Sequence, residues 1–460
     1  MKNYILTAKN YIVIIFFSLI TSSIAVNFES GGNSKELNGK SSPSHIPWSV
    51  NATIYEVNIR QFTPEGTFKA FTPSMQKLKK MGIDILWFMP INPIGVLNRK
   101  GSLGSYYSVK DYTAINPEFG TIEDFKAVVK EAHKLGMRVI IDWVANHTAC
   151  DNLWTKTYPE YYKKDSVGKF ISPFDWTDVI SLDYTNKELW NSMRDAMKYW
   201  IEQCDIDGFR CDVAAMVPLD FWTWVRPQLE AVKPIFMLAE ASEPELHQVF
   251  DMTYNWQLKD LFVDCAKGSK NADDFYKYYE KERVEYPADS YRMVFISNHD
   301  ENSWNGTDKE RFGEAAELFA VITGVVPGMP LVYNGQEAGL DKRLLFFEKD
   351  LIDWKENKMY GVYKKLFHLK KENKALWNGT AGGDFQKIET DDQNIFAFIR
   401  EKDKNKVVVF FNLSASAKQI TANNSKLEGM YKSLFTNTDE KLNSQHQLLL
   451  EPWGYQVYYK

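Results

Sequence analysis

The stretch GFRCDV, residues 208–213, has the pattern of a short buried strand that ends before a helix. Residues two apart on a strand point to the same face, so Arg210 and Asp212 project together. A neighbouring arginine favours the ionised form of a carboxylate, and an ionised carboxylate at the carboxyl end of a strand can act as a nucleophile. An isolated pair of this kind is more often a structural ion pair, so the rest of the chain must decide between the two interpretations.

Length and composition set the first limits. The chain has 460 residues, of which 44% are hydrophobic and 15% aromatic, and its formal net charge is −5. This length fits one barrel with an accessory domain, and the hydrophobic content is typical of a globular protein with a sizeable core. The many aromatic rings give a weak hint of sugar binding, because flat apolar faces suit sugar rings. The negative net charge argues against a nucleic-acid partner.

The first 25 residues have the layout of a secretory signal peptide. Two lysines precede an apolar run at residues 11–20, and small residues follow it up to Ala25. We expect cleavage after Ala25, since the apolar run is short for a membrane span. Residues 26–48 are rich in Ser, Gly, Asn and Lys, which predicts a disordered linker. The expected mature protein is therefore secreted or periplasmic and has no membrane span.

The four cysteines are Cys150, Cys204, Cys211 and Cys265. A secreted chain could pair them in disulfides. Cys211, however, lies within the expected buried strand, which favours a free thiol at that position. No two cysteines have C-x-x-C spacing, so a zinc site is not expected.

Strand-like apolar runs alternate with amphipathic helical stretches between residues 51 and 377. The expected strands are 52–58, 84–89, 138–144, 206–212, 235–239, 252–254, 293–297 and 331–333. The expected helices between them include 72–81, 122–135, 187–203, 219–232, 308–324 and 360–372. Strands that alternate with helices indicate a parallel sheet, and eight such units predict an α/β fold with a closed (β/α)8 TIM barrel. We assign this catalytic barrel to residues 49–147 and 187–378.

Two regions depart from this alternation. Residues 148–186 are aromatic and irregular, and a long irregular insertion in a compact domain is usually functional. We expect a small insertion domain, domain B, beside the mouth of the active site. After Trp377, short alternating stretches separated by Asp and Asn turns predict an all-β C-terminal sandwich domain at residues 379–460.

Four polar stretches stand at the ends of expected strands. They are DWVANH at 142–147, GFRCDV at 208–213, LAE at 238–240 and SNHD at 297–300. In this order and on these strands they resemble the four hallmark regions of the alpha-amylase superfamily, glycoside hydrolase family 13. The stretches 82–93, 104–120 and 328–337 resemble further regions of that family. The resemblance covers nearly the whole barrel, and although each motif is short, their order and spacing together are highly specific.

The resemblance implies a role for each of three carboxylates. Asp212 is the nucleophile, Glu240 the general acid/base, and Asp300 the carboxylate that orients the sugar and stabilises the transition state. Retaining glycosidases need two carboxyl groups roughly 5 Å apart on either side of the scissile bond, and neighbouring barrel strands can supply that spacing. We expect the apolar residues 236–239 to raise the pKa of Glu240, and we expect Arg210 to keep Asp212 ionised.

The resemblance also implies which residues hold the reacting sugar. His147 and His299 would hydrogen-bond its hydroxyl groups, Tyr107 would stack on its ring, and Arg210 belongs with these substrate-binding residues. A lone histidine is more often a satisfied core residue, and Tyr107 could simply pack beneath its loop. Trp176 and tyrosines of the insertion could line further subsites, but the sequence does not choose among them.

The expectation for a metal comes from a departure from the family pattern. Many alpha-amylases bind a structural calcium ion through an asparagine at the position of Asn146 and a lysine-histidine pair just past the nucleophile. Here Ala215 and Met216 stand in place of that pair. Calcium takes roughly six to eight oxygen ligands, which the sequence does not display. We expect no cofactor, with calcium left open, and we expect Asp142 to hold Arg210 and the barrel mouth together.

These observations predict a retaining hydrolase that cleaves α-glucosidic bonds, mainly α-1,4, in starch, maltodextrins or related α-glucans. A transglycosylase of the same family would use the same three carboxylates, and a member that acts on α-1,6 bonds or on cyclomaltodextrins is a further alternative. A non-catalytic sugar-binding relative would typically lack the carboxylates, all of which this chain retains. The sequence predicts neither the chain-length preference nor the oligomeric state.

Overall fold

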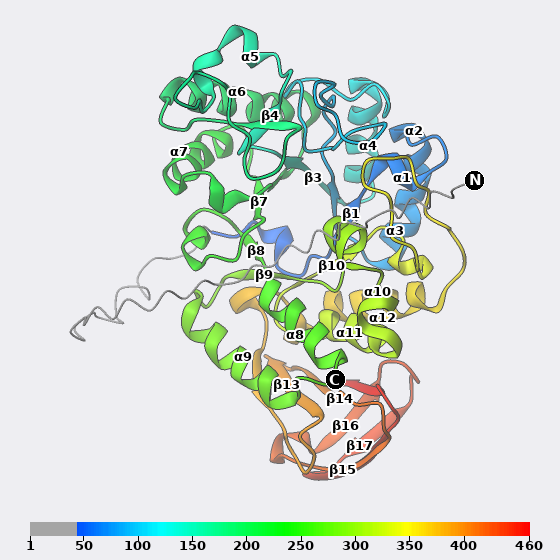
Figure 1. Ribbon diagram of the computed structural model, residues 1–460. Helices are drawn as coiled ribbons and strands as arrows, with labels where there is room; N and C mark the ends of the chain where they lie inside the picture. Colours follow the sequence, from blue (N-terminus) through cyan, green and yellow to red (C-terminus); the bar gives the residue numbers. More distant parts are fainter. Residues whose placement is uncertain (1–43) are drawn as a thin grey trace, which may run out of the picture. The chain divides into compact units, whose positions relative to one another are not determined.

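The computed structural model describes residues 44–460. Its central element is a closed barrel of eight parallel strands in the order β1-β10-β9-β8-β7-β6-β3-β2 (Figure 1). These strands are β1 (Ile54–Val57), β2 (Ile85–Phe88), β3 (Arg138–Trp143), β6 (Gly208–Cys211), β7 (Phe236–Ala239), β8 (Met252–Tyr254), β9 (Tyr291–Val294) and β10 (Met329–Tyr333). Each overlaps a strand expected from the sequence, and the TIM barrel is confirmed.

Helices connect the strands and surround the barrel (Figure 1). The α-helices are α1 (Ile59–Phe62), α2 (Phe68–Phe71), α3 (Met75–Met81), α4 (Ile122–Lys134), α6 (Lys187–Cys204), α7 (Leu219–Glu230), α8 (Trp256–Ala266), α9 (Ala272–Glu285), α10 (Asp308–Phe312), α11 (Ala316–Val325) and α12 (Lys358–Glu372). The 3-10 turns of this part are η2 (Pro47–Ser49), η3 (Thr72–Ser74), η5 (Ala214–Met216), η6 (Pro244–Gln248), η8 (Gly313–Ala315) and η9 (Gln336–Ala338), and η7 (Glu301–Asn305) is a π-helical turn. Polar caps begin several helices: Thr121 and Asp124 form a capping box at the start of α4.

Side chains of the strands alternate between the inside of the barrel and the helical layer, as the period of a strand requires. In β1, Ile54 joins the core inside the barrel, where Trp87 and Leu238 also lie, whereas Tyr55 packs in the larger core between strands and helices. Glu56 follows Ile54 by two residues and is fully buried. The inner face of β1 therefore carries a buried acidic side chain near its carboxyl end.

The strand β6 approaches β7 so closely that only glycine fits at its first position. Gly208 has φ = 153°, and a Cβ atom there would lie 1.9 Å from the carbonyl oxygen of Phe236. The absence of a side chain lets β6 keep its register with both neighbours, in which Arg210 lies beside Asp142 on β3 and Leu238 on β7. This register brings the strand-end residues of β3, β6 and β7 together.

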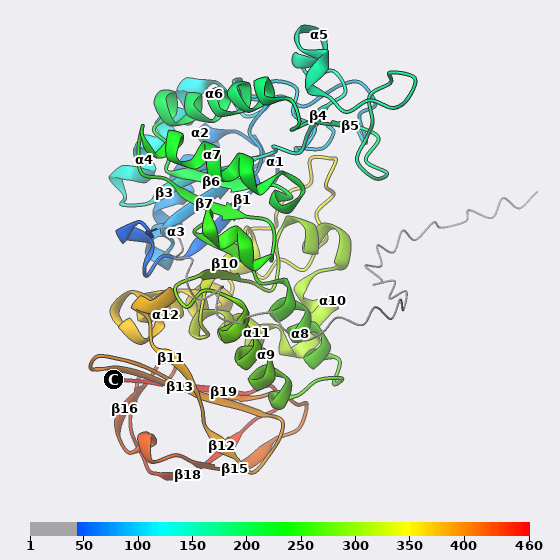
Figure 2. The ribbon, with the colours of Figure 1, turned by 90° about the vertical axis from the view of Figure 1, so that its left-hand side faces the viewer.

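The segment after β3, where the sequence predicts a small insertion domain, contains a short antiparallel pair of strands. Strand β4 (His147–Ala149) pairs with β5 (Val179–Ser181), and α5 (Trp154–Thr157) and η4 (Pro159–Tyr161) lie between them in the chain. In Figure 2 this unit lies at the opposite end of the barrel from the C-terminal sheets. Because His147 is the first residue of β4, the insertion starts directly from a predicted site residue.

The C-terminal residues form two antiparallel sheets (Figure 2). One has the order β11-β13-β14-β19-β16-β17 and the other the order β12-β15-β18. Their strands are β11 (Asp384–Lys387), β12 (Glu389–Thr390), β13 (Ile395–Lys402), β14 (Asn405–Asn412), β15 (Lys418–Asn423), β16 (Gly429–Ser433), β17 (Asp439–Leu442), β18 (Gln445–Leu450) and β19 (Tyr455–Tyr459), with the turns η10 (Lys374–Leu376), η11 (Gly379–Ala381) and η12 (Ser425–Leu427). Ile399, Ile420 and Leu450 pack in one core between the sheets, which confirms the all-β C-terminal domain.

Arg400 joins the C-terminal sheet to the barrel layer. It is buried, and it donates hydrogen bonds of 2.9–3.2 Å to the main-chain oxygens of Val325, Val326, Trp377 and Gly383. Val325 is the last residue of α11, where carbonyl groups have no partner within the helix and favour a positive charge. The guanidinium therefore stabilises the end of α11 and links it to β13.

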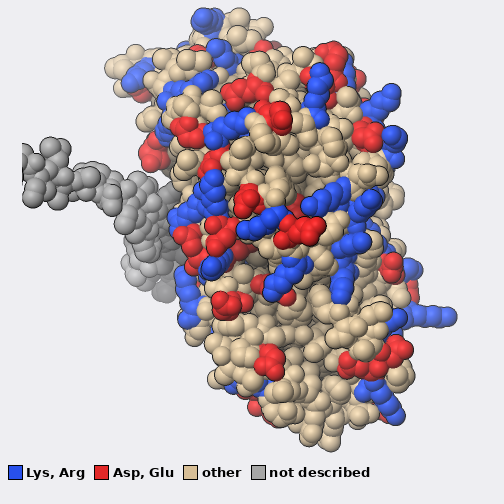
Figure 3. Space-filling model, turned by 90° about the vertical axis from the view of Figure 1, so that its right-hand side faces the viewer, with Lys and Arg blue, Asp and Glu red and all other residues tan. Residues whose placement is uncertain are grey.

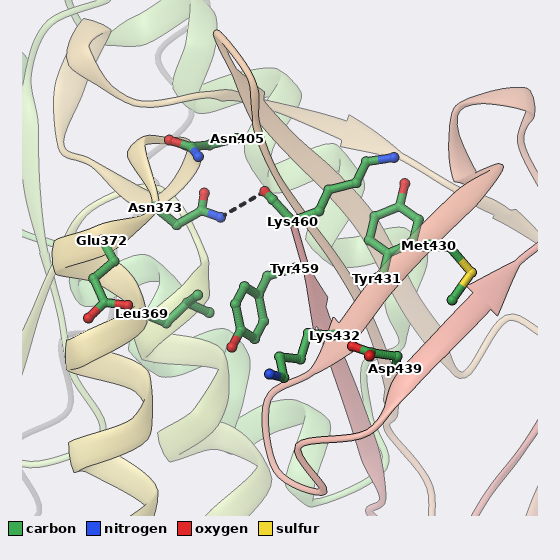
Figure 4. A pocket seen from close by; sticks show the side chains of 10 residues that line it. All are labelled: Leu369, Glu372, Asn373, Asn405, Met430, Tyr431, Lys432, Asp439, Tyr459 and Lys460. Carbon is green, nitrogen blue, oxygen red and sulfur yellow. Dashed lines mark hydrogen bonds between the residues drawn. The ribbon is translucent and has the colours of Figure 1, made fainter.

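A pocket of about 360 Å³ lies between α12 and the C-terminal sheet (Figure 4). Leu369 and Glu372 of α12 form one wall, and Tyr459 and Lys432 lie across from them. None of the residues that line this pocket stands at the carboxyl end of a barrel strand. The pocket is therefore separate from the site that the strand-end motifs predict.

The described chain starts within the expected linker. His45 stacks on Tyr291 with ring centroids 3.8 Å apart, and Trp48 packs on Phe236 at 5.7 Å, so residues 44–48 contact the barrel. The rest of the expected linker and the expected signal peptide lie outside the described residues. Within residues 44–460, no helix combines the length and apolar character that a membrane crossing needs. The four cysteines have free thiols, and Cys211 is buried.

Charged side chains of both signs are interspersed over the face drawn in Figure 3. Lysine and arginine side chains lie next to aspartate and glutamate side chains, in keeping with the small net charge of −5. This face therefore has no continuous basic surface of the kind with which proteins bind nucleic acids.

Candidate active site

Three carboxylates meet at the carboxyl ends of three neighbouring strands. Asp142 lies near the end of β3, Asp212 follows the last residue of β6, and Glu240 follows the last residue of β7. Strand β6 lies between β3 and β7, and its register places Cys211 beside Ala239. The next residues on these two strands, Asp212 and Glu240, are therefore side by side. TIM-barrel enzymes hold their active sites at this end of the barrel.

The guanidinium of Arg210 contacts all three carboxylates. Its Nη1 atom donates to Oδ1 of Asp142 and to Oδ1 of Asp212, both at 2.9 Å. Its Nη2 atom lies 2.8 Å from Oε1 of Glu240. Arg210 is fully buried, and its Nε atom donates to the hydroxyl oxygen of Tyr254 at 3.1 Å. The contact with Asp142 was expected from the sequence, whereas the contact with Glu240 was not.

One guanidinium cannot neutralise three carboxylates. Burial and the negative charge of Glu240 raise the pKa of Asp212 well above its usual range, although Arg210 acts in the opposite direction. Burial also raises the pKa of Asp142 to about 6 against the opposing charge of Arg210. Arg210 thus favours the ionised form of Asp212, as expected from the sequence, but its single charge is shared among three carboxylates. The cluster retains a proton more readily than separate carboxyl groups would.

The backbone after Asp212 is turned so that it contacts Glu240. Val213 has φ = 37° and ψ = 49°, a left-handed conformation that β-branched residues rarely adopt. Its N–H group donates to Oε2 of Glu240 at 2.8 Å. Unfavourable backbone conformations persist where the surrounding structure imposes them, and they gather at active sites. The strained turn at Val213, the residue after Asp212, thus holds the carboxylate of Glu240 in place.

His299 lies between two acidic residues. Its Nδ1 atom is 2.5 Å from Oε1 of Glu56, and its Nε2 atom is 3.3 Å from Oδ2 of Asp300. Burial would lower the pKa of His299, but the charges of Asp300 and Glu56 outweigh burial and raise the pKa to about 9. The ring is therefore an imidazolium at neutral pH and donates from both nitrogens. The Asp300 side chain remains 38% exposed, so that it can face a ligand.

Tyr107 connects His299 to the carboxylate cluster. Its hydroxyl group lies 2.8 Å from Nε2 of His299 and donates to Oδ2 of Asp142 at 3.0 Å. The two rings are stacked, with centroids 5.3 Å apart. Burial and the charge of Asp142 raise the pKa of Tyr107 well above its usual range, so the hydroxyl stays protonated. A continuous polar chain thus runs from Glu56 through His299 and Tyr107 to Asp142.

His147, unlike His299, is uncharged near neutral pH. It is buried, and burial lowers its pKa to about 3, so the ring is neutral near pH 7. Its Nδ1 atom lies 3.2 Å from the side-chain nitrogen of Asn146, which donates to it. The ring of Trp176 packs against the His147 ring at 5.5 Å and 66°, and Phe174 follows at 5.2 Å from Trp176. Trp176 is thus the aromatic residue of the insertion that contacts a predicted site residue.

Sequence reasoning missed three members of this network, Glu56, Trp87 and Tyr254. Trp87 donates from Nε1 to Oδ2 of Asp142 at 3.1 Å, and Tyr254 accepts from Arg210. All three lie within short apolar strands and stand outside the four motifs. One signal was present for Glu56, since an acidic residue at an inward position of a buried strand needs a charged partner. Nothing in the sequence alone connects that position with His299.

Two comparisons with known families cover most of the chain. Residues 28–179 and 163–358 match the model of the alpha amylase catalytic domain, and residues 385–457 match the maltogenic amylase C-terminal domain. The chain belongs to the alpha-amylase family. It is accordingly a glycoside hydrolase, as its strand-end motifs indicated.

Three individual members of the alpha-amylase family resemble this chain over most of its length. An alpha-amylase from Lactobacillus plantarum has a TM-score of 0.80 and 31% identity, covering 89% of this chain and 99% of that one. A maltogenic alpha-amylase from Thermotoga neapolitana has a TM-score of 0.82 and 31% identity, covering 89% and 98%. In sequence, alpha-amylase 3 of Dictyoglomus thermophilum is 24% identical, and the match covers 82% of this chain and 88% of that protein.

Proposed function

We propose that this enzyme hydrolyses mainly α-1,4 bonds of starch, maltodextrins or related α-glucans, with Asp212 as nucleophile and Glu240 as general acid/base. The observation that carries the proposal is the pair of carboxylates on adjacent strands that contact one guanidinium, that of Arg210. Two carboxyl groups held this closely leave no room for a water molecule behind the sugar, so the reaction proceeds with retention through a glycosyl-enzyme. Its family membership supports an α-glucan as substrate.

In the first step, Asp212 attacks the anomeric carbon while Glu240 gives its proton to the leaving glycosidic oxygen. The bond between the anomeric carbon and that oxygen breaks, and an ester bond to Asp212 forms. In the second step, Glu240 takes a proton from water, the water oxygen attacks the same carbon, and the carboxylate of Asp212 leaves. Because Asp212, Glu240 and Asp142 share the charge of Arg210, the cluster can hold the single proton that this cycle needs.

The carboxylate of Asp300, on the other side of the site, stabilises the positive charge that develops on the sugar in the transition state. His299 beside it is held as an imidazolium by the charges of Asp300 and Glu56. In our proposal Asp300 and His299 bind sugar hydroxyl groups, Tyr107 stacks on the reacting ring, and neutral His147 binds from the insertion. Hydrogen bonds to these hydroxyl groups that strengthen in the transition state contribute several kcal/mol in this chemistry.

Product analysis tests the proposed substrate and distinguishes it from the alternatives within the family. Purified enzyme is incubated with linear maltooligosaccharides, pullulan and cyclodextrins, and the products are separated by chromatography. We expect shorter linear maltooligosaccharides from the first substrate. Products longer than the substrate would indicate a transglycosylase, and cleavage confined to the α-1,6 bonds of pullulan would indicate a debranching enzyme. Either result would contradict the proposed reaction while leaving the family assignment intact.

A further inference from the structure

An exposed tryptophan stands next to the candidate active site. Trp304 exposes 52% of its surface, whereas tryptophan is highly buried on average. It lies on the π-helical turn η7, which begins directly after Asp300. Turns of this kind are rare and occur frequently at functional sites. The chain thus places a large flat apolar ring in solvent four residues after a carboxylate of the site.

Aromatic rings connect Trp304 with the inside of the site. The ring of Trp304 lies 5.4 Å from that of Phe346. Phe346 in turn is nearly parallel to Tyr107, with an interplanar angle of 11° and centroids 6.2 Å apart, and lies 6.3 Å from His299. Phe347 adds a further contact to Trp304 at 5.8 Å. The rings form one series from the buried pair Tyr107 and His299 to the surface.

Hydrogen bonds hold the loop that carries Phe346 against the turn that carries Trp304. The side chain of Asn302 donates to the carbonyl oxygen of Lys342 at 3.0 Å and accepts from the N–H of Leu344 at 2.9 Å. Ser303 donates to the carbonyl oxygen of Leu344 at 3.0 Å. Leu344 is buried, so this junction is anchored in the core. The relative position of the two rings is therefore built into the fold.

The loop that leads to Tyr107 is fixed to the same place. The N–H of Leu103 donates to the carbonyl oxygen of Phe347 at 3.0 Å, and the N–H of Ser102 donates to Oε1 of Glu348 at 2.9 Å. Three segments far apart in the sequence thus converge on the aromatic series. Rigid support of this kind is what a binding site requires, because side chains that are already ordered lose little entropy on binding.

We propose that Trp304 and Phe346 form a platform that binds a glucose unit of the α-glucan beyond the unit held by Tyr107 and His299. This inference rests on the proposed function. A pyranose ring has flat faces of C–H groups, which pack against aromatic rings, and aromatic side chains commonly line small-molecule sites. The nearby cations already have partners: Arg343 pairs with Glu310 at 2.7 Å, and Lys342 pairs with Asp350. The platform therefore suits a neutral sugar.

The platform makes catalysis depend on chain length. A substrate too short to reach Trp304 gains nothing from it, whereas a longer chain uses that contact to bind and orient the reacting bond. The test compares kcat/KM for maltoheptaose with kcat/KM for α-glucosyl fluoride, whose single sugar occupies the reacting position. We expect Trp304→Ala to lower the ratio of kcat/KM for maltoheptaose to kcat/KM for α-glucosyl fluoride at least about tenfold. Trp304→Phe, which keeps an aromatic ring, should restore most of the ratio.

Leu449 serves as a matched control, because it is 56% exposed on β18 of the C-terminal domain. Leu449→Ala should leave the ratio at its wild-type value. If Trp304→Ala lowers both rate constants equally, Trp304 only supports the position of Asp300, and the proposed platform is wrong. An unchanged ratio would also overturn it. Wild-type enzyme that fails on both substrates would instead refute the proposed function, so the two failures are distinguishable.

Discussion

The Nη2 atom of Arg210 lies 2.8 Å from the Oε1 atom of Glu240. The arginine that the sequence associates with Asp212 thus also contacts the carboxyl group assigned to proton transfer. Because Arg210 is fully buried, it fixes the two groups of opposite function with respect to one another. Loss of a guanidinium at this place should therefore affect both chemical steps.

Replacement of Arg210 by lysine should lower kcat by at least about 100-fold, because a single ammonium group cannot contact three carboxylates at once. Breaking a buried charge cluster is also destabilising, so we expect a lower melting temperature. Both quantities are measured, and circular dichroism checks the fold. Lys134→Ala, which removes an exposed ammonium group paired with Glu131, provides the control for loss of a charge. Near-wild-type kcat for Arg210→Lys would show that the shared contact has no catalytic importance.

The raised pKa of His299 predicts a loss of stability in alkaline solution. Its pKa is about 9 in the folded chain, against roughly 6.5 in the unfolded chain. The associated stabilisation is fully present below pH 6.5 and is lost as the pH rises through 9, with a total of about 3 kcal/mol. The melting temperature should therefore fall between pH 7 and pH 10.

Glu56→Gln provides the matched variant for this pH dependence. It removes one of the two negative charges that raise the pKa of His299. The variant should be less stable than the wild type at pH 7, and the difference in melting temperature should narrow as the pH approaches 10. A constant difference over this range would mean that Glu56 acts through packing alone.

Chelation should leave the enzyme active and stable. Ala215 and Met216 replace the contacts that calcium has in many relatives, and residues 44–460 contain no group of three His, Cys, Asp or Glu side chains arranged to hold a metal ion. We expect the melting temperature and the activity to be unchanged after exhaustive treatment with a chelator and dialysis. A large fall in the melting temperature that calcium alone restores would contradict this prediction.

The sequence predicted the barrel well because its strands are short apolar runs between turns. All eight were found, and the boundaries differ by a few residues, since the end of an apolar run and the end of a hydrogen-bonded ladder need not coincide. Helices α8 and α9 were not identified. Strands β15 to β17 were missed because they carry many exposed or polar residues and few buried apolar ones.

The sequence predicted the site residues that lie in the four motifs and missed the contacts made by residues outside those motifs. Asp142, Arg210, Asp212 and Glu240 come together because neighbouring strands end at the same level, which the order of the motifs implies. The pairing of Glu56 with His299 joins residues 243 positions apart, and the contact of Phe346 with Trp304 depends on an irregular loop. Such contacts follow from tertiary packing and have no periodic signal in the sequence.

Loss of the proton donor should slow the reaction mainly for substrates with poor leaving groups. Glu240→Gln should be nearly inactive on maltoheptaose, whereas α-glucosyl fluoride should still react in the first step because fluoride needs little protonation. Azide, which attacks without a base, should then restore turnover and yield a glucosyl azide. Asp300→Asn should be impaired on both substrates and should not respond to azide. Equal inactivity of Glu240→Gln on both substrates, with no effect of azide, would contradict its assignment as acid/base.

The most direct test of the account identifies the residue that carries the glycosyl-enzyme. Glu240→Gln is mixed with α-glucosyl fluoride, quenched in acid within seconds and digested for peptide mass spectrometry. Because the second step lacks its base, we predict that the intermediate accumulates and that fragmentation places one hexosyl unit on Asp212. Asp212→Asn/Glu240→Gln, treated in the same way, should carry none. A hexosyl unit on Asp300 or another residue, or no adduct while fluoride is released, would contradict the assignment of Asp212 as the nucleophile.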